Sequence, residues 1–552
     1  MIVRKILVYT LLLSIFLSQF RVAAQDITKP EAPEWITSAV FYQIYPQTFK
    51  DTDGDGIGDL KGIISKLDYV KSLGVNAIWI NPFYLSPFCD AGYDVADFYT
   101  VDPRYGDNKL AKQLFEEAHK RGIKIVLDFV IGHVSVEHPW FKASIEKHPK
   151  YKNWFIWTDN TWKTPSEYAS KFIRGYSSRN GSYMTNFFWC QPKLNYGFKK
   201  EEIKYDWQLP IDHPDVLALK EEMKNVLKYW LDQGVDGFRV DMAYSAGKDF
   251  WRDVRQMFDQ DYPDAFLVSE WGDPALAIDA GFHADFMHWF KGYEDLFHKK
   301  WFTLDDDTYS FFEPAGKGDI TVFLDAFQSQ YSQLKNNGYI SIPVDNHDMV
   351  RVKNFGRDDL DLEIIYAFQM TFPSIPFIYY GDEIGMRQLP LEDAPAVEGS
   401  YSGRSGDRTP MQWDASKNYG FSTADKDQLY LPQDEAQDAP TVARQLDDDQ
   451  SLLAKTKKLV EMRKSEKALQ AYATFEVIYA NKDQYPFIFS RANENEKILV
   501  VLNPSKEPIN VSIGVNANDG FRLLMGDGVE LSTEKGYTQV TCKGRSYGIF
   551  RY

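Results

Sequence analysis

Charged and polar residues end five of the apolar runs in the central part of the chain. The runs end as DFVIGH, GFRVDMA, LVSEW, VDNHD and YYGDE, and the polar residues are Asp128, His133, Arg239, Asp241, Glu270, His347, Asp348, Asp382 and Glu383. If the runs are parallel strands of one barrel, their carboxyl ends share a rim. Such a crowd of buried charge is costly unless it serves a site, so we expect these residues to form one.

The chemistry that suits this group is glycoside cleavage, in which a nucleophilic carboxylate and a protonated carboxylic acid flank the bond. Asp241 lies two residues after Arg239, on the same side of a strand, so we expect the guanidinium to keep it ionised as the nucleophile. Glu270 follows the apolar FLVS and precedes Trp271. An apolar setting raises a carboxyl pKa, which favours Glu270 as general acid and then general base.

Three more of these residues fit substrate binding. We expect Asp348 to hold sugar hydroxyls next to the reacting carbon, while His133 and His347 donate hydrogen bonds that orient the sugar as charge develops on it. Each residue alone is more typical of a cap or an ion pair. Only their convergence on one rim favours a site.

A second acidic group lies near the N-terminus, in KDTDGDGIGDLKGI at residues 50–63, with its carboxylates at Asp51, Asp53, Asp55 and Asp59. The spacing matches the first half of an EF-hand loop, but position twelve is Gly62 instead of Glu. Four carboxylates and the Ile57 carbonyl offer five oxygens, enough for a structural calcium completed by water. The alternative is an acidic, solvated turn, in which the carboxylates repel one another.

The elements that position these residues alternate between short apolar runs and longer segments of helical period. The runs cover 39–46, 75–83, 123–133, 235–243, 265–271, 280–288, 339–348 and 375–384. Helical stripes intervene, and two of them stop at Gly74 and Gly122. Eight such units without a glycine-rich phosphate turn predict an α/β fold, a (β/α)8 TIM barrel.

Two long intervals and the C-terminal part depart from this alternation. Residues 134–212, after the third run, are predicted to form a small inserted subdomain, called domain B below, and the loop 385–448 is expected to overhang the barrel mouth. The catalytic barrel then covers residues 25–470. Residues 471–552 contain short strands with turns and predict a C-terminal antiparallel β-sandwich.

Residues 1–24 have the features of a signal peptide: Arg4 and Lys5, then an apolar run too short to span a membrane, and a small-residue cleavage site before Gln25. We therefore expect an exported enzyme, periplasmic or secreted, without membrane insertion. Loss of this segment takes the net charge from −17 to −20. Such a charge repels nucleic acid and suits a neutral substrate.

Four segments, DFVIGH, GFRVDMA, SEW and VDNHD, resemble in order the signature regions of the α-amylase superfamily, glycoside hydrolase family 13. QIYPQTF, AGYDVADF, IPFIYYGDEIGM and RTPMQW resemble its flanking motifs. The resemblance implies a retaining mechanism, with Asp241 as nucleophile, Glu270 as acid/base and Asp348 as transition-state stabiliser. It also implies a structural calcium in the first strand-to-helix loop, an α-glucan oligosaccharide or polysaccharide substrate, and a sugar site lined by Tyr93, Asp94, His133, Arg239, His347 and Arg408.

Within that superfamily the chain resembles the α-glucosidase and oligo-1,6-glucosidase branch. Asp94 and Arg408 match a pair that closes the pocket behind a terminal sugar, which implies exo action. Several positions depart from the usual patterns: Lys193 makes the fifth motif QPKLN instead of QPDLN, Gly132 replaces a calcium-ligating Asn, and Met242 leaves the choice between α-1,4 and α-1,6 linkages open.

The chain has three cysteines, Cys89, Cys190 and Cys542, too few for a disulfide scaffold. By the resemblance, Cys89 and Cys190 both lie near the join of domain B and the barrel, which suggests that they pair. Three free, buried thiols are the alternative.

Two functions fit these features. The first is a retaining glycosidase that cleaves α-1,4 or α-1,6 glucosidic bonds in starch-derived or isomalto-type oligosaccharides. The second is a transglycosylase or isomerase of the same family, acting on trehalose or sucrose through the same glycosyl-enzyme intermediate. A non-catalytic binding protein would lack one of the three carboxylates, and all three are present.

Overall fold

The computed structural model describes residues 29–288, 292–294, 296–297, 310–313, 318–334, 337–354, 356–390, 404–517, 520–534 and 536–552. The expected signal peptide at residues 1–24 lies outside this part of the chain. Within the described residues, no helix combines the length and apolarity needed to cross a membrane.

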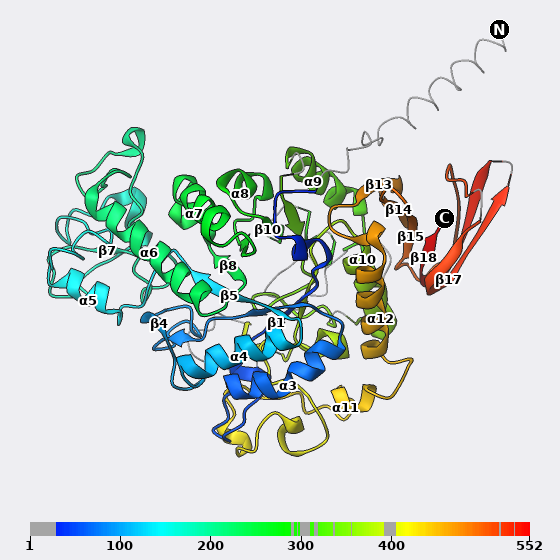
Figure 1. Cartoon of the computed structure of the whole chain (residues 1–552), viewed down its shortest axis with the longest axis horizontal. Coiled ribbons are helices and arrows are strands. Elements are labelled where there is room, and N and C mark those ends of the chain that lie inside the picture. Colours follow the sequence, from blue (N-terminus) through cyan, green and yellow to red (C-terminus); the bar gives the residue numbers. More distant parts are fainter. Residues whose placement is uncertain are drawn as a thin grey trace, which may run out of the picture.

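Eight parallel strands form the central sheet and follow one another around it in chain order (Figure 1). They are β1 (Phe41–Ile44), β2 (Ala77–Ile80), β5 (Lys124–Val130), β8 (Gly237–Asp241), β9 (Phe266–Ser269), β10 (Ala284–Phe286), β11 (Tyr339–Ser341) and β12 (Phe377–Tyr379). β1 pairs with both β2 and β12, the first strand with the second and with the last. Each strand falls within one of the eight apolar runs, so the predicted (β/α)8 barrel is confirmed.

Helices follow the strands along the chain, and their ends agree with the sequence signals. α3 (Leu60–Ser72) begins at Asp59, which caps it by accepting from Gly62 N, and Asp107 caps α4 (Asn108–Lys120) in the same way. Gly74 and Gly122 follow these two helices with positive φ of 87° and 69°, as expected for left-handed caps. The remaining helices are α2 (Pro46–Phe49), α5 (Pro139–Ile145), α6 (Pro214–Asp232), α7 (Lys248–Asp261), α8 (Pro274–Ala280), α9 (Ile320–Gln333), α10 (Asp359–Thr371), α11 (Val442–Gln445) and α12 (Leu452–Ser465).

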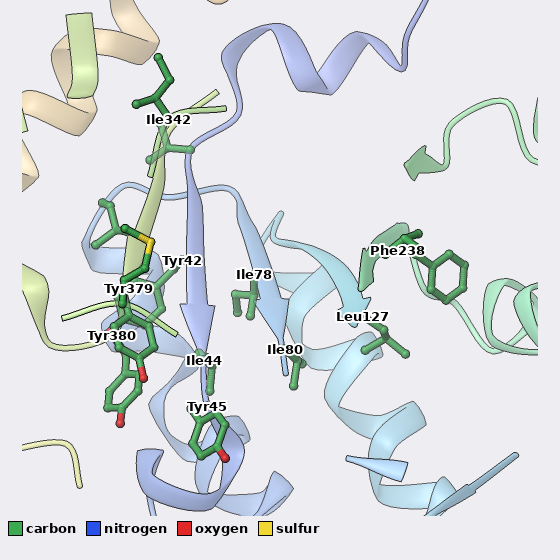
Figure 2. Packing of buried hydrophobic residues seen from close by; sticks show 14 of the residues in the cluster. Tyr42, Ile44, Tyr45, Ile78, Ile80, Leu127, Phe238, Ile342, Tyr379 and Tyr380 are labelled. Carbon is green, nitrogen blue, oxygen red and sulfur yellow. The ribbon is translucent and has the colours of Figure 1, made fainter. Parts of the chain in front are cut away.

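Successive strand residues belong to two different cores. Phe41, Trp79 and Phe266 pack together in one cluster. Their strand neighbours, such as Tyr42 and Ile78, belong to the large cluster that contains the helix residues (Figure 2). Because side chains alternate across a strand, this division separates the barrel interior from the layer between strands and helices. It explains why the strands are apolar on both faces.

Two small additions lie on the β2 and β5 side of the barrel. A hairpin of β3 (Tyr84–Leu85) and β4 (Asp97–Val101) follows β2. Between β5 and α6, the segment expected to be domain B contains α5 and the pair β6 (Phe172–Ile173) and β7 (Tyr183–Met184). A minor apolar cluster that includes Phe172 and Trp207 supports this segment.

The C-terminal part is antiparallel, as predicted, and its six strands form one hydrogen-bonded sheet (Figure 1). The strands are β13 (Thr474–Tyr479), β14 (Phe487–Ala492), β15 (Lys497–Asn503), β16 (Ile509–Ile513), β17 (Arg522–Glu534) and β18 (Tyr537–Arg551). The long β18 pairs with β17 along its length and with both β15 and β16. A separate apolar cluster with Ile488, Val501 and Val540 packs on this sheet.

Candidate active site

A cavity of about 1030 Å³ brings the three candidate catalytic carboxylates together. Asp241 is the last residue of β8, Glu270 directly follows β9, and Asp348 lies in the loop after β11. All three line the cavity. The sequence predicts this convergence, and the barrel provides it because its strands are parallel. Asp382 and Glu383, which follow β12, were expected in the same site but do not line the cavity: Asp382 pairs with Arg351, and Glu383 accepts from Tyr42 and Tyr69.

Arg239 connects this group. Register places Arg239 beside Asp128 on β5, and its Nη1 lies 2.9 Å from Asp128 Oδ1 and 3.0 Å from Asp241 Oδ1. Its Nη2 lies 2.8 Å from Glu270 Oε2. One buried guanidinium therefore holds three carboxylates from three neighbouring strands.

The pKa shifts of Asp241 and Glu270 differ from the expectation. Burial raises the pKa of Asp241 well above its ordinary value, against the opposing effect of Arg239. Burial alone would also raise the pKa of Glu270, but Arg239 and His288, whose Nε2 lies 3.3 Å from Oε1, hold it well below its ordinary value. The prediction that the apolar setting of Glu270 leaves its pKa raised is therefore wrong for the free site, because the contacts of Glu270 with Arg239 and His288 outweigh the effect of burial.

Two arginines from the loop after β12 hold Asp348. Arg404 Nη1 and Arg408 Nη2 lie 2.7 Å and 2.8 Å from Asp348 Oδ1. Burial alone would raise the pKa of Asp348, but His347 and these guanidinium groups hold it well below its ordinary value. Asp348 is therefore a charged acceptor suited to sugar hydroxyls.

The candidate histidines use their ring nitrogens within the protein. His347 Nε2 lies 2.6 Å from the Tyr93 hydroxyl, and its Nδ1 accepts from Gln43 Nε2 at 2.9 Å. His133 lines the cavity, yet its ring nitrogens contact the Tyr93 carbonyl and Asn186 Nδ2, both at 3.1 Å. Both histidines were expected to donate hydrogen bonds to a sugar. In the free site their ring nitrogens instead contact neighbouring protein groups.

Tyr93 is placed as the resemblance implies. It lines the cavity, and its hydroxyl donates to Asp128 Oδ2 at 2.9 Å and accepts from Asn81 Nδ2 at 2.9 Å. Its ring also stacks on that of His347, with centroids 5.5 Å apart. Tyr93 is thus a rigid wall of the cavity.

Asp94 and Arg408 do not form the predicted pair. The carboxylate of Asp94 turns into its own loop, where it accepts from the backbone N–H groups of Cys89 and Asp90, each at 2.9 Å. Instead, Asp90 and Arg404 line the cavity and form an ion pair of 3.4 Å. Neither residue was predicted, because both lie in loops, where position along the chain does not determine the place in the fold.

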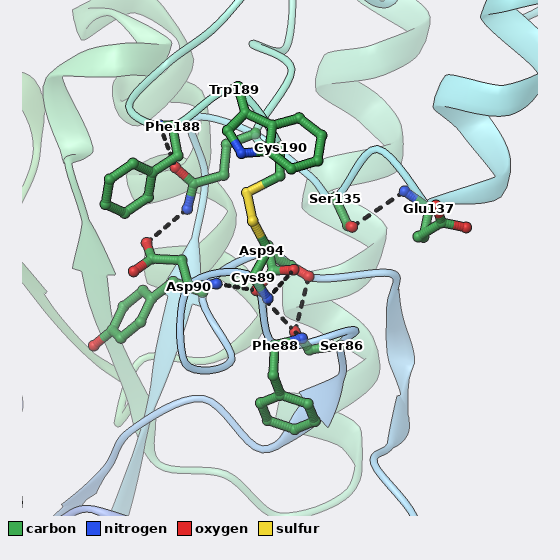
Figure 3. Close-up of a disulfide and its surroundings, with 12 residues drawn as sticks. Ser86, Phe88, Cys89, Asp90, Asp94, Ser135, Glu137, Phe188, Trp189 and Cys190 are labelled. Atoms are coloured by element: carbon green, nitrogen blue, oxygen red, sulfur yellow. Dashed lines mark hydrogen bonds between the residues drawn. A yellow bond between two sulfur atoms is a disulfide. The ribbon is translucent and has the colours of Figure 1, made fainter. Parts of the chain in front are cut away.

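A disulfide links this loop to domain B. The structure joins Cys89 and Cys190, which are 101 residues apart in sequence, and leaves Cys542 free and buried (Figure 3). Next to it, Gln191 Nε2 donates to Asp90 Oδ2 at 2.7 Å. The disulfide and this hydrogen bond join adjacent residues of the two segments, and together they hold Asp90 in the cavity.

The aspartate loop lies between β1 and α3. Oxygens of Asp51, Asp53 and Asp59 lie within 4.8 Å of one another, which fits a cation. Asp55 is not in that group, and its Oδ1 accepts from Ile57 N at 2.8 Å. The loop thus brings together three of the four predicted carboxylate ligands.

Gly132 and Met242 meet at Asn186. A side chain on Gly132 would approach Asn186 Nδ2 to 2.2 Å, so the amide occupies the space that a larger residue would need. The same nitrogen lies 3.6 Å from Met242 Sδ, and Met242 lines the cavity with a positive φ of 42°. Met242 is thus held on the cavity wall by its contact with Asn186.

Known proteins resemble this chain over most of its length. The family model "Alpha amylase, catalytic domain" matches residues 43–471. An oligo-1,6-glucosidase of Heyndrickxia coagulans is 30% identical over 90% of this chain and 96% of its own. A salivary alpha-glucosidase of Aedes aegypti is 31% identical over 90% of this chain and 95% of its own. Among solved structures, the trehalulose synthase MutB from Pseudomonas mesoacidophila MX-45 superposes with a TM-score of 0.77 at 27% identity, covering 95% of this chain and 100% of that one.

Proposed function

Because this chain belongs to the alpha-amylase family and is a glycosidase that cleaves α-glucosidic bonds, we propose that it releases single glucose units from the non-reducing ends of oligosaccharides. The observation that carries this proposal is the linked set of Asp90, Arg404 and Asp348. These three charged side chains lie together on the cavity wall, where they offer several partners to the hydroxyls of one terminal sugar.

The proposed reaction has two displacements with retention of configuration. Asp241 attacks the anomeric carbon while Glu270 gives its proton to the glycosidic oxygen, so the bond to the leaving sugar breaks and a glucosyl ester on Asp241 forms. Water then attacks the same carbon and gives a proton to Glu270, which frees glucose and the Asp241 carboxylate. Asp348 binds hydroxyls beside that carbon throughout.

This reaction needs the proton on Glu270 and the charge on Asp241, whereas in the free site burial raises the pKa of Asp241 and the contacts of Glu270 lower the pKa of Glu270. Since both carboxylates contact Arg239, they titrate as a coupled pair. A glycosidic oxygen that accepts from Glu270 stabilises its protonated form, and positive charge developing on the sugar stabilises ionised Asp241. The reaction therefore proceeds from the form of the pair that has its proton on Glu270.

Product analysis tests the exo action. The enzyme is incubated with maltose, isomaltose, trehalose, sucrose, starch and dextran, and the first products are separated by chromatography. We expect glucose as the first product from maltose or isomaltose, and the preferred disaccharide defines the linkage. Early release of longer oligosaccharides from starch would contradict exo cleavage.

Isomerisation of sucrose is the second candidate. It is favoured by the likeness to a solved trehalulose synthase over nearly the whole chain. An isomerase uses the same glucosyl ester but transfers glucose to fructose instead of water. In the experiment above, trehalulose or isomaltulose from sucrose would favour this candidate, whereas glucose and fructose would exclude it.

Two further features belong to this proposal. Calcium held by Asp51, Asp53 and Asp59 would tie the loop after β1 to the start of α3, because Asp59 also caps that helix. Residues 1–24 would direct export and be removed before Gln25, which N-terminal sequencing of the protein from the periplasm or medium checks.

A further inference from the structure

Two lysines lie on the domain B wall of the catalytic cavity. Lys171 and Lys193 both line it, on either side of β7, which ends at Met184, and of Thr185, which follows it. Lys193 N donates to the Met184 carbonyl, and Thr185 N donates to the Lys171 carbonyl, each at 2.8 Å. The backbone therefore brings the two cations to the same wall, although they are 22 positions apart.

Neither ammonium has an acidic partner in the described part of the chain. Arg404, the other cation that lines the cavity, is paired with Asp90 and Asp348. The acids lining the described cavity are Asp90, Asp241, Glu270 and Asp348, and no ion pair joins any of them to Lys171 or Lys193. The wall thus carries two uncompensated positive charges.

Lys171 is exposed, so the cost of this arrangement falls on Lys193. Lys193 is half-buried, and burial together with repulsion by Lys171 lowers its pKa. Two cations that repel each other beside a binding cavity favour an anion, since a neutral hydroxyl relieves neither the repulsion nor the desolvation.

We propose that Lys171 and Lys193 bind an anionic group, a carboxylate or a phosphate ester, on the leaving group of the substrate. An anion on the transferred glucose itself would lie among Asp90, Asp241 and Asp348 and be repelled. The leaving group is the part of the substrate that extends away from them. This assignment rests on the proposed function, because it takes the carboxylates as the place of bond cleavage.

Matched disaccharides test the proposal. Maltobionate and maltitol have the same α-1,4 glucoside. They differ at one carbon of the leaving group, which is a carboxylate in maltobionate and a hydroxymethyl group in maltitol. A second pair is maltose with and without phosphate on O6 of its reducing sugar. For the wild type we expect kcat/KM to be about tenfold higher for the anionic member of at least one pair at low salt.

The variants Lys171→Met and Lys193→Met should lower that ratio towards one. Lys163→Met is the matched control, since Lys163 is an exposed lysine of the same segment that does not line the cavity, and it should leave the ratio unchanged. Ratios that stay the same in both cavity variants for both pairs would overturn the proposal.

Calorimetric binding to the Glu270→Gln variant separates this inference from the proposed function. A lysine-dependent preference for the anionic ligand supports the anion site even if the wild type releases no glucose. The absence of glucose release would contradict the proposed hydrolysis and leave the anion site standing. Equal affinity for both members of both pairs would overturn the anion site whatever the turnover.

Discussion

Arg239 Nη2 lies 2.8 Å from Glu270 Oε2, although the sequence places Arg239 nearest to Asp241 on its own strand. The same guanidinium contacts Asp241 through Nη1 at 3.0 Å. The candidate nucleophile and the candidate acid are therefore coupled through one cation. The balance of charge between them then depends on what else contacts each carboxylate.

His288 provides the first test of this balance. It contacts Glu270 Oε1 at 3.3 Å and helps to lower the pKa of that carboxyl. Replacing it by His288→Gln removes a group that stabilises the ionised form, so the pKa of Glu270 rises. Since the protonated form is the acid and the two carboxylates titrate as a pair, the limbs of the kcat/KM profile should move to higher pH. If neither limb of the kcat/KM profile moves, in a variant with unchanged thermal unfolding, Glu270 is excluded as a group that sets the pH profile.

Asp90 and Asp94 provide a matched pair of substitutions. Asp90 lines the cavity and is paired with Arg404, whereas Asp94 accepts from the backbone of its own loop. We expect Asp90→Asn to lower kcat/KM for the preferred disaccharide about 100-fold. Asp94→Asn should chiefly lower the melting temperature. The opposite pattern would restore Asp94 as the sugar-binding residue.

Chelation tests the metal. If Asp51, Asp53 and Asp59 hold calcium, EGTA should lower the melting temperature, and added calcium should restore it. Asp53→Asn is a suitable variant because Asp53 is exposed, and it should abolish the difference between EGTA and calcium. A wild-type melt that does not respond to EGTA would show that this loop is stable without a metal.

Asp285 on β10 gives a pH-dependent stability. Its Oδ1 accepts from Ser269 Oγ and Trp271 N, the neighbours of Glu270 on either side, and burial raises its pKa to about 8. The folded protein keeps a proton that the unfolded chain loses above about pH 4, so stability falls as pH rises from about 4 to about 8. Asp285→Asn should remove this loss, by at most about 1.4 kcal/mol per pH unit. If the free energies of unfolding of the wild type and of Asp285→Asn change with pH in the same way between about pH 5 and 8, the role of Asp285 is contradicted.

The barrel and the meeting of Asp241, Glu270 and Asp348 were predictable from sequence because parallel strands bring their ends to one rim. Each of these residues stands at or just after a strand end, so its position along the chain determines its place in the fold. The eight apolar runs were long enough to identify the strands without a structure.

Asp90 and Arg404 were not predictable, since both lie in loops. The place of Asp90 depends on Gln191 and on the disulfide to Cys190, which join it to a segment about 100 residues away. The directions of the pKa shifts of Asp241 and Glu270 could not be predicted from the sequence either, because they depend on contacts between neighbouring strands and on His288.

The central claim is that Asp241 forms the glucosyl ester. The most direct measurement is incubation with 5-fluoro-α-glucosyl fluoride, which slows the second displacement, followed by proteolysis and mass spectrometry. We predict one added fluoroglucosyl group per chain on the peptide that contains Asp241, and none in Asp241→Asn. A label on Glu270 or Asp348, or turnover with inverted products and no label, would contradict the account.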